Sequence, residues 1–142
     1  MEQPSRVMVV DDEPDTVTFL RTWLEDMGYE TCAESDPERV VEAALAQKPA
    51  LLLLDVNMPS QSGIEVYRRL RETQPLCGLP VIFITGATDF HLFGRACSPL
   101  PEPAARIEKP IDLTVLKKAV DKALSGKGAV PLSQKPDPGE TE

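Results

Sequence analysis

The chain has 142 residues, enough for about one domain with a single core, and its apolar (42%) and charged (27%) fractions are typical of a soluble globular protein. Its net charge of −8 argues against direct nucleic acid binding. No apolar run approaches the roughly 20 residues that cross a bilayer, and the N-terminus lacks the pattern of a signal peptide. We therefore expect a cytoplasmic protein that does not bind membranes.

Cysteine and histidine usage narrows the chemistry further. Cys32, Cys77 and Cys97 are odd in number and widely spaced, which is a poor pattern for disulfides or for zinc. His91 is the only histidine, so a histidine cluster, a Ser-His-Asp triad or a Cys-His pair cannot be assembled. Most familiar hydrolase and zinc chemistries are thereby excluded.

The chain opens with a strand-like apolar run, Val7–Val10, of the kind that is buried on both faces of a parallel sheet. An amphipathic helix follows from about Pro14 to Met27, and Gly28 is placed to end it. Tyr29–Ala33 is also strand-like, but Glu30 interrupts it, so we expect an edge strand.

Asp36 predicts the start of a second helix as its N-cap, with Pro37 at the first helical position. The residues expected to face inward are Val40, Val41, Ala44 and Leu45. A second buried strand is predicted at Leu51–Leu54, followed by a helix over about Ile64–Glu72 with Ile64, Tyr67 and Leu70 inward.

The remaining elements are a buried strand at Val81–Ile84, a short or irregular fourth helix within Asp89–Cys97, and a charged edge strand at Ala105–Glu108. The prolines from Pro99 to Pro103 require the fourth helix to stop early. A last helix covers about Leu113–Leu124. We assign residues 1–125 to one domain and residues 126–142, rich in Gly, Pro, Ser and charge, to a disordered tail or linker.

Five alternations of strand and helix predict an α/β fold. With three apolar central strands and two polar edge strands, right-handed crossovers favour a flavodoxin-like (βα)5 arrangement. Its five-stranded parallel sheet has the order 2-1-3-4-5, with helices on both faces.

Polar residues follow four of the predicted strands. Asp11 and Asp12 follow the first strand, Asp55 the third, Thr85 the fourth and Lys109 the fifth. Because sites in such sheets form beyond the carboxyl ends of the strands, we expect these side chains to meet at one edge. Taken singly, each has a structural explanation: an acidic pair often caps a helix, and Asp55 or Thr85 can cap a turn. Their coincidence favours a functional site.

The charge of this group predicts its chemistry. Two like charges ~4 Å apart repel by about 4 kcal/mol at an effective dielectric constant of 20, so three carboxylates beside Lys109 favour a hard cation such as Mg²⁺. With the cation bound, Asp55 can attack a phosphoryl donor. Lys109 can neutralise charge on the phosphoryl oxygens, and the Thr85 hydroxyl can donate one further hydrogen bond.

Four motifs together resemble those of response-regulator receiver domains over about residues 5 to 125: Val9-Val10-Asp11-Asp12-Glu13, Leu54-Asp55-Val56-Asn57-Met58-Pro59 with Gly63 beyond, Ile84-Thr85-Gly86-Ala87, and Glu108-Lys109-Pro110. The resemblance implies that Asp55 is the phosphoacceptor and that Asp12, assisted by Asp11, holds Mg²⁺ with the backbone carbonyl of Asn57. It also implies that Thr85 shifts on phosphorylation and that a cis bond joins Lys109 to Pro110. The implied partners are a histidine kinase or phosphotransfer protein and an unknown output protein.

One departure concerns the switch. Receiver domains usually carry an aromatic residue three positions before the lysine, whereas this chain has Arg106, which we expect at the surface. Phosphorylation chemistry is unaffected, but the usual output surface is called into question. Phe90 or Phe93 would be the substitutes, although core packing is the simpler role for both.

Alternative functions remain open from the residues. The chain can be the receiver portion of a longer regulator or an inert docking module. A phosphohydrolase with an aspartyl nucleophile would need a second Asp where Asn57 stands. We therefore expect no enzyme beyond catalysis of its own phosphorylation and dephosphorylation.

Overall fold

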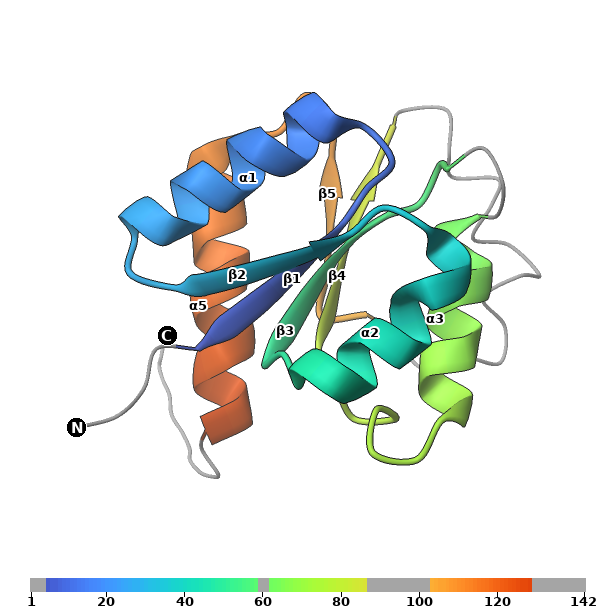
Figure 1. Cartoon of the computed structure of the whole chain (residues 1–142). Coiled ribbons are helices and arrows are strands. Elements are labelled where there is room, and N and C mark those ends of the chain that lie inside the picture. Colours follow the sequence, from blue (N-terminus) through green and yellow to red (C-terminus); the bar gives the residue numbers. More distant parts are fainter. Residues whose placement is uncertain (1–4, 59–61, 87–102, 129–142) are drawn as a thin grey trace.

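In the computed structural model of the chain, the described residues are 5–58, 62–86 and 103–128. They form one parallel sheet with helices on both faces (Figure 1). The strand order is β2-β1-β3-β4-β5, which confirms the predicted topology. The strands are β1 (Arg6–Val10), β2 (Glu30–Glu34), β3 (Leu51–Asp55), β4 (Val81–Thr85) and β5 (Ala105–Glu108).

The helices are divided between the two faces of the sheet. They are α1 (Pro14–Asp26), α2 (Val40–Gln47), α3 (Gly63–Glu72) and α5 (Leu113–Gly128). Leu20 of α1 and Leu116 of α5 belong to one core cluster, and Ala44 of α2 and Tyr67 of α3 belong to the other. No helix in the described ranges combines the length and apolar content required to cross a membrane.

The central strands divide their side chains between these two cores. In β3, Leu52 and Leu54 join the cluster under α2 and α3, while Leu51 and Leu53 join the cluster under α1 and α5. All four are buried, as are the apolar residues of β4. Because burying a leucine side chain contributes roughly 1.5–3 kcal/mol, these runs anchor the sheet. The edge strands β2 and β5 carry the exposed positions, as the sequence predicts.

Helix ends follow the predicted signals with two differences. Gly28 has a φ of +97° directly after the cap of α1, and Asp36 accepts a hydrogen bond from the Glu38 N–H at 3.0 Å. However, Pro37–Arg39 forms a 3₁₀ turn, so α2 begins only at Val40. The last helix continues past the expected Leu124 to Gly128. The predicted helix within Asp89–Cys97 and residues 129–142 lie outside the described residues.

The prediction that Leu45 faces inward was wrong, because its side chain is 40% exposed. Val40 and Ala44 are four residues apart and therefore share the buried face of α2. Leu45 lies about 100° further round the helix axis, in the last turn, where it reaches solvent.

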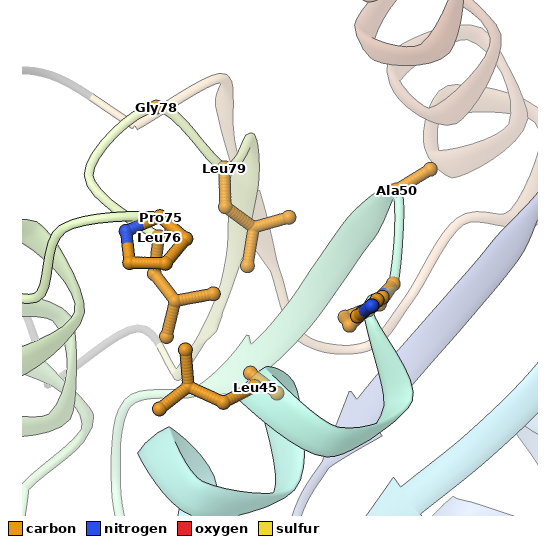
Figure 2. Close-up of a pocket in the computed structure, with 9 residues that line it drawn as sticks. Leu45, Ala50, Pro75, Leu76, Gly78 and Leu79 are labelled. Carbon is orange, nitrogen blue, oxygen red and sulfur yellow. The ribbon is translucent and has the colours of Figure 1, made fainter.

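A hollow of about 530 Å³ lies between the end of α2 and the segment that connects α3 to β4. Figure 2 shows Leu45 facing Leu76 and Pro75 across it. Ala50 and Leu79, which also line it, precede β3 and β4. The hollow is therefore at the amino ends of the strands, away from the predicted site at the carboxyl ends.

Arg71 organises this connecting segment. Its guanidinium lies 4.6 Å from the centre of the Tyr67 ring. It donates hydrogen bonds to the carbonyl oxygens of Leu76 (3.1 Å), Cys77 (3.1 Å) and Leu79 (2.6 Å). One side chain at the end of α3 thus satisfies three backbone acceptors that no strand or helix pairs.

Arg71→Ala should therefore destabilise the fold by about 2–3 kcal/mol, since it removes its hydrogen bonds to three carbonyls, of which the contacts to Leu76 and Leu79 are partly buried. Urea unfolding measures the change, with the exposed Arg39→Ala as the matched arginine control, expected within about 0.5 kcal/mol of the native sequence. Equal stability of the two variants would contradict this role for Arg71.

Candidate functional site

Three carboxylates gather at the carboxyl edge of the sheet, as predicted. Asp55 is the last residue of β3, and Asp11 directly follows β1. Because these strands pair with Val10 opposite Leu54, their ends lie side by side. One ligand oxygen from each of Asp11, Asp12 and Asp55 lies within 4.8 Å of the other two. Asp11 and Asp55 are each only 2% exposed, whereas Asp12 is half-buried.

Hydrogen bonds hold the two buried carboxylates. The Glu13 N–H donates to Asp11 Oδ1 at 2.9 Å. The Asn57 N–H donates to Asp55 Oδ1 at 3.2 Å, and Lys109 Nζ lies 3.3 Å from the same oxygen. In each case the amide belongs to the residue two positions after the aspartate. The turn that follows the strand therefore orients the carboxylate at the end of that strand.

Thr85 and Lys109 belong to the same edge of the sheet. Thr85 is the buried last residue of β4, one position past Ile84, which pairs with Asp55. The Lys109 N–H donates to the Thr85 carbonyl oxygen at 2.6 Å. The peptide bond between Lys109 and Pro110 is cis, as the family resemblance implies. All five predicted side chains are therefore carried by neighbouring strand ends.

Burial controls the protonation of the site. It raises the pKa of Asp11 above 3.8. Burial and the neighbouring Asp11 charge raise the pKa of Asp55 from 3.8 to about 6, although Lys109 and the Asn57 N–H oppose the shift. A raised acid pKa means that the fold disfavours the negative charge. The cluster would be stabilised by an added cation.

The donor set fits Mg²⁺. This ion prefers oxygen ligands at about 2.1 Å, so oxygens on opposite sides of it are about 4.2 Å apart, and it usually retains several waters. Asp11, Asp12 and Asp55, with one oxygen each within 4.8 Å of the others, would hold the ion and would leave it room for bound water. The amide of Asn57 already turns toward Asp55, which keeps this segment against the cluster.

From the sequence, the position of one further residue, Arg106, was anticipated and another, Ser62, was overlooked. Arg106, at the position of the usual aromatic residue, is exposed in β5 as expected. Ser62 was missed: its Oγ accepts hydrogen bonds from the Ile64 N–H (3.1 Å) and the Glu65 N–H (3.4 Å) and caps α3. The available signal was Ser62 with Glu65 three positions later, the pattern of a capping box. Phe90 and Phe93 lie outside the described part of the chain.

Comparisons with known proteins agree with this geometry. A family model for the response regulator receiver domain matches residues 7–121. Protein Rrf1 of Nitratidesulfovibrio vulgaris is 30% identical over 123 residues, which are 86% of this chain and 84% of Rrf1.

Two other matches define the extent of the similarity. The alkaline phosphatase synthesis transcriptional regulatory protein PhoP of Bacillus subtilis is 39% identical over 80 residues, 56% of this chain but 32% of PhoP. The crystal structure of the receiver domain of a signal transduction histidine kinase from Syntrophus aciditrophicus superposes with a TM-score of 0.78. It is 28% identical, with 91% of this chain and 97% of that chain covered. The match to PhoP therefore spans only about a third of that protein's length.

The protonation of Asp55 predicts a pH-dependent effect of Asp55→Asn on stability. The folded protein binds the Asp55 proton more tightly than the unfolded chain does, so this carboxylate destabilises the fold as pH rises from 3.8 to about 6. Without metal, Asp55→Asn should stabilise the protein by on the order of 3 kcal/mol above pH 7, and the gain should vanish below about pH 4.

Thermal or urea unfolding across this pH range measures the effect. Asp26→Asn, on the exposed last turn of α1, is the control and should change stability little at any of these pH values. A stability difference for Asp55→Asn that does not vary with pH would contradict the assignment.

Proposed function

The chain belongs to the response regulator receiver family, and on this basis we propose that it accepts a phosphoryl group on Asp55 from a histidine kinase or phosphotransfer protein. The observation that carries the proposal is the surroundings of Asp55: a buried carboxylate beside two other acids, with Lys109 Nζ at 3.3 Å. A structural ion pair would need neither Asp11 nor Asp12.

The hydrogen bonds to Asp55 favour one of its two oxygens as the nucleophile. Within the described residues, the Asn57 N–H and Lys109 Nζ both contact Oδ1. We therefore assign the attack to Oδ2. A lone pair of Oδ2 forms the new bond to phosphorus, the bond from phosphorus to the donor atom breaks, and the donor leaves with that electron pair.

The remaining site residues would serve charge and orientation. Asp12 and Asp11 would hold Mg²⁺ together with Asp55 and the Asn57 carbonyl, and the bound ion supplies neutralisation of the phosphoryl oxygens. Lys109, with its ammonium already at the acceptor, adds a second positive charge. The Thr85 hydroxyl, on the neighbouring strand end, would donate a hydrogen bond to a phosphoryl oxygen.

We further propose that the output is a protein–protein interaction. The net charge of −8 opposes direct contact with a nucleic acid backbone, which is itself negatively charged. The exposure of Arg106 favours a switch that runs through Thr85 and the segment after it, without the usual pairing of the hydroxyl with an aromatic ring.

Incubation with acetyl phosphate and Mg²⁺ tests the chemistry. Mass spectrometry should find one added phosphoryl group, which should be absent from Asp55→Asn and from metal-free samples. The rate of phosphorylation should fall at least about tenfold in Lys109→Ala. Lys117→Ala, which removes a surface lysine paired with Asp121, is the control and should react at the native rate. Phosphorylation that persists in Asp55→Asn would place the acceptor elsewhere.

Mg²⁺ should also stabilise the folded protein, because the metal relieves the repulsion among the three carboxylates. At 100 times its dissociation constant, an ion that binds only the native state contributes about 2.7 kcal/mol. Thermal melts should show this gain in the native sequence and in Asp26→Ala, and lose most of it in Asp12→Ala. Identical melts of the native sequence with and without Mg²⁺ would refute the metal site.

A further inference from the structure

Gly63, the buried first residue of α3, lies directly against the main chain of Asp55. A Cβ atom at this position would overlap the Asp55 carbonyl oxygen and would lie 2.8 Å from the Val56 Cα and 3.1 Å from the Asp55 carbonyl carbon. Its φ does not lie in the left-handed region, so glycine is required here for close approach and not for conformation.

The neighbouring atoms cannot move aside independently, because all of them are backbone. The end of β3 is paired on both sides, with Val10 of β1 opposite Leu54 and Ile84 of β4 opposite Asp55. The Val56 N–H also donates to the Ile84 carbonyl oxygen at 3.0 Å.

The helix side of the contact is equally well held. The Gly63 N–H donates to the Val56 carbonyl oxygen at 2.7 Å, and the Ser62 Oγ caps the first turn of α3. Further along the helix, Tyr67 and Leu70 are buried in the core. A side chain at position 63 would therefore displace either the acceptor strand or the start of the helix.

We propose that Gly63 is a positioning residue: the start of α3 is a rigid support that fixes the main chain of Asp55 and, through it, the place of the acceptor carboxylate relative to Asp11 and Lys109. This inference rests on the proposed phosphorylation of Asp55. A misplacement of about 1 Å can slow a reaction about 100-fold, so even partial displacement should be measurable in the rate.

Gly63→Ala tests the proposal, with Gly78→Ala as its matched control, since a Cβ at Gly78 meets no atom within 4 Å. At saturating acetyl phosphate and Mg²⁺, Gly63→Ala should lower the maximal rate of Asp55 phosphorylation by at least about tenfold. Gly78→Ala should remain within twofold of the native sequence. A native rate in Gly63→Ala would overturn the proposal.

A second pair of variants separates positioning from stability and covers the case in which Gly63→Ala does not fold. Ser62→Ala removes the cap and loosens the same support without adding an atom, whereas Ile64→Val trims a buried side chain in the same turn. We expect slower phosphorylation in Ser62→Ala than in Ile64→Val when both are folded and equally stable. Equal rates in these two variants would argue against a positioning role.

The amide NMR signal of Asn57 gives a readout that does not depend on phosphorylation, because this N–H donates to Asp55 Oδ1. It should shift in Gly63→Ala and Ser62→Ala but not in Gly78→Ala. If the native protein is not phosphorylated, the proposed function fails, yet this shift still decides the role of Gly63. An unshifted Asn57 signal in both variants would refute it.

Discussion

The site depends on a fold that holds three carboxylates close together, although two of them are shielded from water. Asp11 and Asp55 are almost fully buried, and burial, together with the neighbouring Asp11 charge, raises the pKa of Asp55 to about 6, so the fold opposes ionisation of this carboxyl. The opposing stabilisation comes from the strands that carry them. β1, β3 and β4 are buried on both faces, so the apolar side chains just before each polar end hold these strand ends in place.

The order of the strands brings these carboxylates to one point of the sheet edge. After β1 the chain moves outward to form β2 and returns past β1 to form β3, so the ends of β1 and β3 are adjacent where the winding direction changes. Ligand sites in parallel α/β sheets form at such points. The hollow beside Leu45 lies at the other end of the strands, where no comparable set of carboxylates is found among the described residues.

The sequence predicted the strand order and the gathering of the acidic residues, because both follow from apolar runs and from the residues that end them. It failed for Leu45, because Val40 and Ala44 form the buried face of α2 and Leu45 lies about 100° further round the helix axis, where it reaches solvent. The role of Gly63 was also beyond its reach. That role depends on how closely α3 approaches β3, and a sequence motif records the glycine without the distance.

Asp55 is therefore supported from three directions at once. The strand ladder holds its main chain laterally, Gly63 of α3 abuts its carbonyl, and Lys109 meets its carboxylate. Lys109 is itself tied through its N–H to the Thr85 carbonyl, so β4, β5 and α3 all converge on a single residue. Closely packed backbone transmits displacement instead of absorbing it. A phosphoryl group on Asp55 would then act on the start of α3 as well as on the rim formed by Thr85 and Lys109, which gives the proposed signal two routes out of the site.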